Sequence, residues 1–413
     1  MKKKPIINPR NPRIAALDIG TEKTCAMIAE LETDGCFNVI GYGYRRSKGI
    51  INGAIANIKE AAQVIRETLN DAETMTHYTI ESLIVNTPIN TISSNLIQGS
   101  APISPSDEIS PSDVNDLIKM LISKKLSSEE TMLHCIPYNY YTEHTMIIEN
   151  PVGMTANKLG VRMSCISAPT NSLKIIDKVL SESRIEINKK VVCPFAAGLG
   201  CFDTDKNGIV IDIGAGKTSV AIFVDDIVAY TAILPYGGNS ITTKIANDLI
   251  ISHDEAERIK VRHGCALYTD DDGIITVKTA SNQNDKISVS ELNKIIASKV
   301  TDIFKQIKNH LEDMRMYEIE SKRILLTGGG SQLQGICTVA ADIFEGRQVA
   351  LAHPSRLRGN ISNLDPTSPI YSNIAGMMRF ATIEKYQTPY LAEIGNPGLL
   401  KTIKSLFTKK QTF

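Results

Sequence analysis

The sequence predicts an α/β protein built from two similar lobes, and three observations support this. Leu17-Asp18-Ile19-Gly20-Thr21 and Ile211-Asp212-Ile213-Gly214-Ala215-Gly216 are matching aspartate-led glycine turns. Each turn lies between two apolar runs that are typical of β-strands. In each half a meander of strands, a helix and an insertion are followed by a return to the main fold. This repetition predicts a duplicated domain that closes on a ligand from both sides.

The first half begins with a β-meander and a helix. Strands are predicted at 14–17, 24–31 and 37–44, with turns at Gly20-Thr21 and Asp34-Gly35, and a buried strand at 82–86. Residues 58–73 have apolar positions spaced for one buried helical face.

Residues 87–165 differ in composition, being rich in Ser, Pro and Asn. The phrase Ser-Pro-Ser-Asp occurs at 104–107 and at 110–113, and its second copy predicts a helix at 114–126 capped by Ser112 or Asp113. Polar strands around 135–148 and a turn at 150–154 complete a small α+β module.

The main fold then resumes and is interrupted once more. A strand at 161–168, a helix at 171–183 and strands within 208–223 and 227–234 lead to a second insertion at 243–320. That insertion is predicted to hold a helix at 254–262, a hairpin near Asp270-Asp271-Asp272-Gly273 and a long helix at 289–316. A strand at 323–327 runs into Gly328-Gly329-Gly330.

Composition excludes several classes of protein. The chain has 413 residues, 42% of them hydrophobic, and 45 basic residues balance 45 acidic ones, which disfavours a nucleic-acid partner. Prolines interrupt the N-terminal segment, so no signal peptide is expected, and no apolar run is long enough to span a membrane. The eight cysteines form no Cys-x-x-Cys pair, which favours reduced, mostly buried thiols in the cytoplasm.

The two glycine turns have the chemistry of an anion site. A strand, a tight turn and a second strand bring backbone N–H groups to one point. Asp18 and Asp212 would repel phosphate directly, so they imply a bridging cation such as Mg²⁺. Thr21 offers a hydroxyl and Lys23 a positive charge. An ordinary hairpin is the alternative for either turn taken alone.

Other phosphate, cofactor and metal motifs fit poorly. Gly214 to Thr218 contains Gly-Lys-Thr, but a Walker A loop would need glycine at Ile211, and a β-rich segment follows where a helix should. Lys217 either reaches phosphate or is a solvated turn residue. Gly328 to Gly330 would let a flat ring approach the backbone, whereas a dinucleotide fingerprint would need glycine at Leu333. The acidic turn at 270–272 lacks calcium-loop spacing, and the histidines lack metal spacing.

Several sequence segments, taken together, resemble one family. The two aspartate-led turns and the late glycine run resemble the phosphate and adenosine motifs of the actin, Hsp70 and sugar-kinase superfamily. Asn150-Pro151-Val152-Gly153, Lys260-Val261-Arg262-His263-Gly264-Cys265-Ala266 and Leu325-Leu326-Thr327-Gly328-Gly329 are similar to FtsA, the bacterial cell-division relatives of actin. The resemblance covers nearly the whole chain.

The resemblance implies an actin-like, duplicated ribonuclease-H-like fold with an inserted α+β subdomain (1C) in the first lobe and a second-lobe insertion (2B). The expected divisions are 12–86 and 166–205 for subdomain 1A, 87–165 for 1C, 206–242 and 321–388 for 2A, 243–320 for 2B, 389–397 for a linker and 398–410 for a membrane-targeting helix.

The resemblance also implies ATP with Mg²⁺ as cofactors. Asp18 and Asp212 would hold the metal through water. The phosphates would meet Gly20, Thr21, Glu22, Lys23, Gly214, Ala215, Gly216, Lys217 and Thr218; the ribose Gly237, Gly238 and Asn239; and the adenine Glu257, Lys260, Gly328, Gly329 and Gly330. Without the resemblance, Glu257 and Lys260 would be interpreted as an ordinary surface pair.

One departure from the family pattern bears on catalysis. Relatives that hydrolyse ATP well place Glu or Gln where this chain has Cys193, and a thiol orients water poorly. Ala215 replaces a carboxylate found in actin. We therefore expect strong ATP binding with at most weak ATPase activity, and we assign no catalytic residue.

The C-terminal tail is amphipathic. Leu399, Leu400, Ile403, Leu406 and Phe407 fall on one helical face, while Lys401, Lys404 and the Lys409-Lys410 pair lie elsewhere. This pattern predicts an in-plane anchor that prefers anionic lipid, with a helix packed on the body as the alternative. One copy should bind weakly, whereas a filament gains avidity.

The preferred interpretation is an ATP-binding, filament-forming adaptor that ties the tubulin-like division protein FtsZ to the cytoplasmic face of the inner membrane at the division site. By resemblance the FtsZ C-terminal tail docks on 243–320, with Lys299 as a basic contact, and later division proteins bind subdomain 1C. A small-molecule kinase or a pilus-assembly adaptor of the same fold is the alternative. A chaperone would need a long β-rich domain, for which nothing remains after residue 390.

Overall fold

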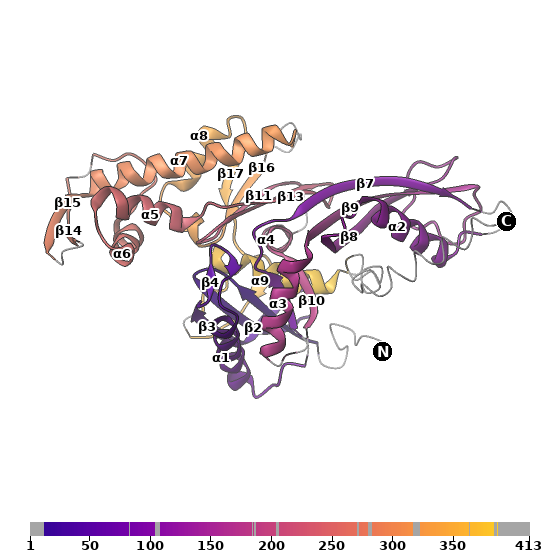
Figure 1. Ribbon diagram of the computed structural model, residues 1–413, viewed down its shortest axis with the longest axis horizontal. Coiled ribbons are helices and arrows are strands. Elements are labelled where there is room, and N and C mark those ends of the chain that lie inside the picture. The colour runs from indigo at the N-terminus through magenta and orange to yellow at the C-terminus, as the bar shows by residue number, and fades with distance from the viewer. Residues whose placement is uncertain are drawn as a thin grey trace.

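The computed structural model describes residues 12–81, 83–103, 108–183, 185, 187–203, 206–270, 272–279, 283–316, 323–362, 364–383 and 386. Two sheets form the centre of the molecule (Figure 1). The first has six strands in the order β10-β6-β1-β2-β3-β18, and the second has five in the order β13-β12-β11-β16-β17. The predicted α/β architecture of two similar lobes is confirmed.

The first sheet begins as the sequence predicts, with slightly longer strands. Its members are β1 (Arg13–Ile19), β2 (Lys23–Leu31), β3 (Phe37–Arg46), β6 (Leu83–Thr87), β10 (Ile187–Val192) and β18 (Leu357–Arg358). The helices α1 (Ile58–Thr76) and α3 (Thr170–Glu182) pack on it through one apolar core. Asn57 begins α1 by accepting hydrogen bonds from the Lys59 and Glu60 backbone N–H groups.

The second sheet repeats this arrangement. Its strands are β11 (Gly208–Ile213), β12 (Thr218–Val224), β13 (Ile227–Leu234), β16 (Arg323–Thr327) and β17 (Gln348–Leu351). In both lobes the turn connects two antiparallel strands, β1 with β2 and β11 with β12, and a later strand pairs in parallel with the first. Asp18 and Asp212 are each the next-to-last residue of their strand. The duplication inferred from the glycine turns therefore extends to strand register.

Two helices join the lobes at the centre, α4 (Cys193–Cys201) and α9 (Ser372–Thr382) (Figure 1). A Cβ added at Gly376 would lie 1.7 Å from the Ala196 carbonyl oxygen, and one at Gly200 would lie 1.9 Å from the Ser372 oxygen. Only glycine permits this backbone-to-backbone contact. The close crossing fixes α4 and α9 relative to each other between the lobes.

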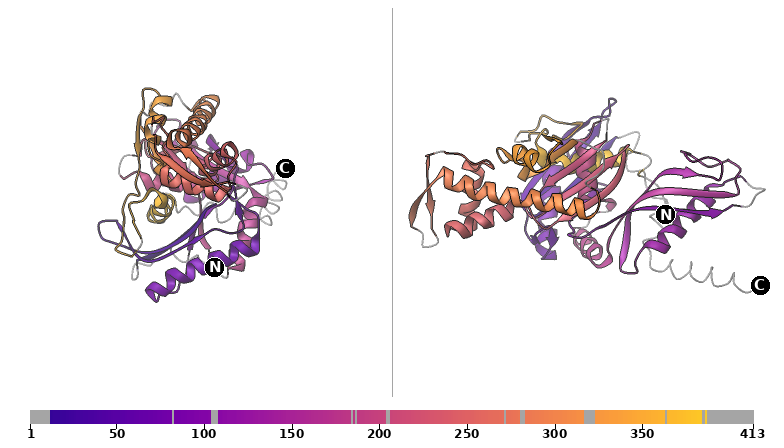
Figure 2. Two further views of the ribbon diagram at one scale, coloured as in Figure 1. Left: turned by 90° about the vertical axis from the view of Figure 1, so that its left-hand side faces the viewer. Right: turned by 90° about the horizontal axis from the view of Figure 1, so that it is seen from above.

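The first insertion forms a separate layer at one end of the molecule (Figure 2). It contains β7 (Ser93–Pro102), α2 (Pro111–Lys125), β8 (Glu130–Tyr141) and β9 (Lys158–Pro169), with the strand order β7-β9-β8. The predicted cap of α2 is wrong. Ser110 is the cap, and Asp113 closes a capping box with it, because Pro111 already occupies the first helical turn. The turn at 150–154 is confirmed by a hydrogen bond from Met154 N to Pro151 O.

The second insertion lies at the opposite end (Figures 1 and 2). Its elements are α5 (Gly238–Leu249), α6 (His253–His263), β14 (Ile274–Lys278), β15 (Asn284–Ser288) and α7 (Val289–Asp313). The predicted hairpin exists but is displaced, because Ile274 to Lys278 pairs with Asn284 to Ser288 beyond the acidic residues. Asp272 and Gly273 directly precede the first strand rather than forming a turn between two strands.

Several short elements complete the fold. They are a small hairpin of β4 (Ile50–Ile51) and β5 (Ala54–Ile55), the helix α8 (Ile336–Ile343) and two 3₁₀ turns, η1 (Gly329–Gln332) and η2 (Pro369–Tyr371). Of the eight cysteines, seven are buried, and all are free thiols, as the sequence indicates. Within the described residues no helix is both long and apolar enough to cross a membrane. The predicted linker 389–397 and membrane-targeting helix 398–410 lie outside the described residues.

Candidate functional site

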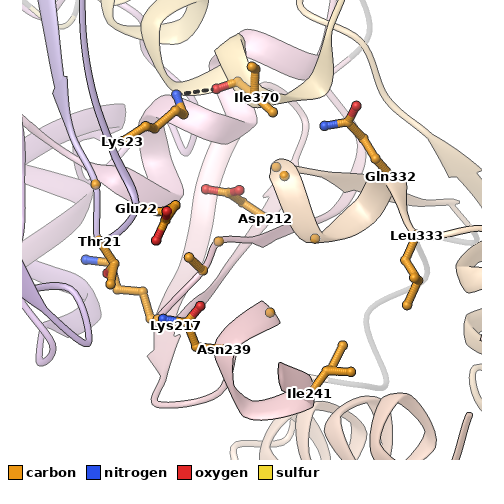
Figure 3. A pocket seen from close by; sticks show the side chains of 18 of the residues that line it. Thr21, Glu22, Lys23, Asp212, Lys217, Asn239, Ile241, Gln332, Leu333 and Ile370 are labelled. Carbon is orange, nitrogen blue, oxygen red and sulfur yellow. Dashed lines mark hydrogen bonds between the residues drawn. The ribbon is translucent and has the colours of Figure 1, made fainter. Parts of the chain in front are cut away.

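A cavity of about 690 Å³ lies between the lobes. Most of the residues predicted to bind a nucleotide and its metal line it: Asp18, Gly20, Thr21, Glu22, Lys23, Asp212, Gly214, Ala215, Gly216, Lys217, Gly238, Glu257, Lys260, Gly328, Gly329 and Gly330. Asn239, which was placed near the ribose, lines it as well (Figure 3). These residues come from both glycine turns, two helices of the second lobe and the late glycine run.

The first glycine turn places Asp18, paired with Lys23, at the cavity wall. Gly20 N donates to Lys23 O at 2.8 Å, which closes the turn. The Lys23 ammonium bonds Asp18 Oδ2 at 2.9 Å and crosses to Ile370 O at 2.7 Å (Figure 3). Asn86 Nδ2 donates to the other Asp18 oxygen at 2.5 Å. Burial alone would lower the pKa of Lys23, but the Asp18 carboxylate outweighs burial and raises it.

The second glycine turn presents Asp212 in a different environment. Its side chain accepts a hydrogen bond from Asn373 Nδ2 at 2.9 Å. The Gly328 backbone packs so closely that an added Cβ would lie 2.1 Å from Asp212 Oδ1. Burial, and then the charge of Asp18, raise the pKa of Asp212 to about 6. The two carboxylates therefore interact across the cavity.

This arrangement fits a divalent cation whose coordination is completed by a bound phosphate compound and water. Two mutually repelling carboxylates favour a hard cation with oxygen ligands. No group of three or more His, Cys, Asp and Glu side chains in the described part of the chain could hold a metal alone. Water and phosphate oxygens would have to complete the coordination, as is usual for Mg²⁺.

Glu257 and Lys260 form a half-buried network rather than an isolated surface pair. The Lys260 ammonium lies 2.6 Å from Glu257 Oε2 and 2.8 Å from the Thr242 hydroxyl, and it also donates to Gly238 O at 3.3 Å. Burial would raise the pKa of Glu257, but the Lys260 charge outweighs burial and lowers it. The network joins α6 to the start of α5 at the cavity wall.

Two predicted residues do not line the cavity. Thr218 is fully buried and its hydroxyl donates to Tyr236 O at 2.7 Å, away from the phosphate side. Gly237 packs behind the second turn, where an added Cβ would lie 2.5 Å from Ala215 O. The start of α5 also holds the turn, since Gly238 N and Asn239 N donate to Gly214 O and Ala215 O.

Cys193 lines the cavity at the start of α4. Its thiol donates to Thr87 O at 3.4 Å, and Asn86 Nδ2 lies 3.6 Å from its sulfur. Burial raises the pKa of Cys193, so the group is a neutral thiol at neutral pH. Such a group is a poor general base.

Sequence reasoning missed several cavity residues, among them Asn86, Asn373, Val261, Gln332 and Leu333. Asn86 had a recognisable signal, because it is a polar residue near the end of an otherwise apolar strand. Asn373 had none, since its contact with Asp212 depends on a helix 161 positions away in the chain.

Comparison with known proteins decides the family. A model described as "Cell division protein FtsA" matches residues 209–376, and a model of the SHS2 domain inserted in FtsA matches residues 90–167. The cell division protein FtsA of Agrobacterium fabrum is 27% identical over 399 residues, covering 92% of this chain and 89% of that protein. This chain belongs to the FtsA family. FtsA of Escherichia coli strain K12 is 25% identical over 380 residues, covering 89% of this chain and 90% of that protein.

Solved structures confirm the actin-like fold of this FtsA-family chain. A PilM–PilN type IV pilus biogenesis complex has a TM-score of 0.63 at 16% identity, covering 89% of this chain and 98% of the other. MreB5 of Spiroplasma citri bound to ADP has a TM-score of 0.55 at 14% identity, covering 91% and 98%. A MamK double helical filament has a TM-score of 0.51 at 14% identity, covering 89% and 99%.

Proposed function

We propose that this FtsA-family chain binds Mg²⁺–ATP between its lobes and assembles into filaments that attach the FtsZ ring to the membrane. The observation that carries the proposal is the pair of matching glycine turns, which direct Asp18 and Asp212 into one cavity. The ADP-bound MreB5 structure shares the fold and supports nucleotide as the ligand class.

Different groups of the chain would bind the phosphates, the cation and the base. Backbone N–H groups in the two turns, with Lys23, would face the phosphates, where charge-assisted hydrogen bonds are strong. The cation would reduce the repulsion between Asp18, Asp212 and phosphate. Gly328 to Gly330 leave space beside the Glu257–Lys260 network for a flat base. Titration calorimetry with ATP should therefore give tight binding with Mg²⁺ and much weaker binding with EDTA; equal binding in both would contradict the metal's role.

Hydrolysis should be slow. The neutral Cys193 thiol occupies the position where efficient relatives would place a water-orienting carboxylate or amide, and it donates to a backbone carbonyl instead of accepting from water. Phosphate release should stay below about 1 s⁻¹, the low end of ordinary enzymes. Faster release would contradict the proposal of a binding and assembly protein.

Membrane attachment would depend on the tail and on self-assembly. The apolar face of 398–410 and its lysines would enter the surface of an anionic bilayer, at the cytoplasmic face of the inner membrane. Ordering the tail costs about 1–2 kcal/mol per residue, which offsets most of the gain for one copy. Many tails on one filament would add avidity on the order of 10²–10⁴. The MamK filament, which shares the fold, supports assembly along one axis.

Co-sedimentation with anionic liposomes tests this directly. The full chain should pellet with ATP and bind less without ATP, and a chain lacking 398–413 should stay in solution. A matched variant, Leu406→Glu, changes one apolar position and should also stay in solution. Tight coating of liposomes by a non-polymerising variant would disprove the coupling to assembly.

Two division partners complete the proposal. The FtsZ C-terminal tail would dock on 243–320, where Lys299 lies half-buried on α7, and later division proteins would bind the first insertion. Lys299→Ala should weaken binding of an FtsZ tail peptide, and Lys294→Ala, an exposed lysine on the same helix, should serve as its control. Equal affinity for wild type and Lys299→Ala would remove this contact.

A pilus-assembly adaptor remains the alternative with a specific observation behind it, the likeness to the PilM–PilN complex. The two FtsA models that match residues 90–167 and 209–376 favour the division role. A small-molecule kinase would need a catalytic Asp or Arg facing a small substrate pocket, and it would have no use for the amphipathic tail at 398–410.

A further inference from the structure

Lys217 is held across the gap between the lobes, not exposed as a solvated turn residue. It belongs to the second glycine turn, yet its ammonium donates to the Ile89 carbonyl oxygen of the first lobe at 2.8 Å. Ile89 is buried in the connection that follows β6. Because the acceptor is fixed backbone, this bond ties the tip of the turn to the opposite lobe.

The small β4–β5 hairpin makes the second half of this contact. Its turn residues Asn52 and Gly53 have φ angles of 47° and 78°, the left-handed region typical of tight hairpin turns. An added Cβ at Gly53 would lie 2.6 Å from Lys217 Cδ, and one at Gly216 would lie 2.8 Å from Asn52 Cα. The hairpin therefore packs directly on the lysine stem and on the neighbouring glycine.

The contact lies beside the phosphate side of the cavity. An added Cβ at Gly216 would also lie 2.7 Å from the Thr21 hydroxyl, so the two glycine turns meet at this point. Thr21, Gly216 and Lys217 all line the cavity, and Figure 3 shows Thr21 and Lys217 on the same side of it. Opening the lobes here would have to break the Lys217–Ile89 bond and separate the hairpin from Gly216.

We propose that Lys217 is a positioning residue that latches the second-lobe turn to the first lobe, and that release of this latch limits nucleotide dissociation. The inference rests on the proposed nucleotide binding. A latch differs physically from a phosphate ligand, because it slows the escape of every ligand in the cavity, whether or not that ligand carries phosphate.

Dissociation rates of mant-labelled adenosine, ADP and ATP distinguish the two roles. Lys217→Met keeps the stem and removes the ammonium, and it should accelerate dissociation of all three by a similar factor, about tenfold for the loss of one charge-assisted hydrogen bond. Lys217→Arg should restore slow dissociation in part. Lys244→Met, an exposed second-lobe lysine paired with Asp248, should change nothing.

A second variant disrupts the Lys217 contact from the first-lobe side. Gly53→Ala puts a methyl group against the Lys217 stem at a residue that does not line the cavity, and it should also accelerate dissociation of all three ligands. In the double variant the two effects should be less than additive, because both break one contact.

Hydrogen–deuterium exchange of ligand-free protein tests the latch independently of binding. Backbone amides of residues 50–55 should exchange several-fold faster in Lys217→Met than in wild type. Acceleration confined to ADP and ATP, with adenosine unaffected, would make Lys217 a phosphate ligand and overturn the latch. Unchanged dissociation or unchanged exchange would overturn it as well. Failure of the wild type to bind any of the ligands would disprove the proposed function, whereas the exchange result would still decide the latch.

Discussion

The two lobes place an aspartate at the same strand position but neutralise it differently. Asp18 has a salt bridge to Lys23 and an amide hydrogen bond from Asn86. Among the described residues Asp212 forms no ion pair, and its side chain accepts a hydrogen bond from the Asn373 amide. Burial and Asp18 raise the pKa of Asp212 to about 6. Duplication thus reproduced the backbone while the side-chain environments diverged.

This difference predicts different roles for Asp18 and Asp212. A carboxylate that already has a fixed cation contributes to the structure of its lobe, whereas a buried carboxylate without one gains most from an added cation. We therefore expect Asp18 to matter chiefly for folding, and Asp212 chiefly for metal-dependent binding. Four experiments test that contrast.

Removing the first-lobe cation should have the largest effect. Lys23→Met leaves Asp18 without its ammonium and breaks the cross-lobe bond to Ile370 O, so it should cost about 3–5 kcal/mol of unfolding free energy. Urea unfolding measures this, with Lys244→Met as the exposed control. A loss below about 1 kcal/mol would remove the contrast between the lobes.

Neutralising the second-lobe carboxylate should affect binding rather than folding. Asp212→Asn should weaken Mg²⁺–ATP binding about a hundredfold, roughly 2.7 kcal/mol, while leaving Mg²⁺-free binding nearly unchanged or improved. The ligand-free variant should remain folded, because an amide is less costly to bury than a charge. Titration calorimetry with and without Mg²⁺ checks both statements, and equal losses in both conditions would contradict them.

The two asparagines offer a matched pair. Asn86 donates to Asp18 and to Ile19 O and accepts from Ile19 N, so Asn86→Ala should cost about 2–3 kcal/mol. Asn373 donates one side-chain hydrogen bond, to Asp212, and Asn373→Ala should cost only about 1 kcal/mol. Thermal unfolding of both variants sharpens the comparison, and the reverse order of stability would argue against it.

The pH dependence should be the smallest effect. The folded-state pKa of Asp212, about 6, lies above the unfolded value, so its favourable contribution is present at low pH and is lost as pH rises through about 6. Relative to Asp212→Asn, the ligand-free wild type should lose about 1 kcal/mol between pH 5 and pH 7.5. Melting curves of both proteins at these pH values measure the difference. Parallel pH profiles would show that Asp212 is not perturbed.

Much of the architecture could be predicted because it depends on local patterns. The spacing of apolar residues located α1, α3, α6 and α7 within a few residues, and the glycine turns located β1–β2 and β11–β12. The α2 cap was predicted at Ser112 or Asp113, although Ser110 is an equally good capping residue two positions earlier. The structure uses Ser110, because Pro111 already lies in the first helical turn. The β4–β5 hairpin escaped prediction because two-residue strands have no periodicity.

The sequence by itself determined the fold class, the family resemblance and the backbone turns that line the cavity, since these depend on residue type and spacing along the chain. Only the tertiary structure decided which lysine neutralises which aspartate, that Thr218 faces backwards and that Lys217 crosses to Ile89. The physical reason is that charge compensation and interlobe bonds join residues far apart in the chain. Their energies depend on burial and distance, which local patterns do not encode.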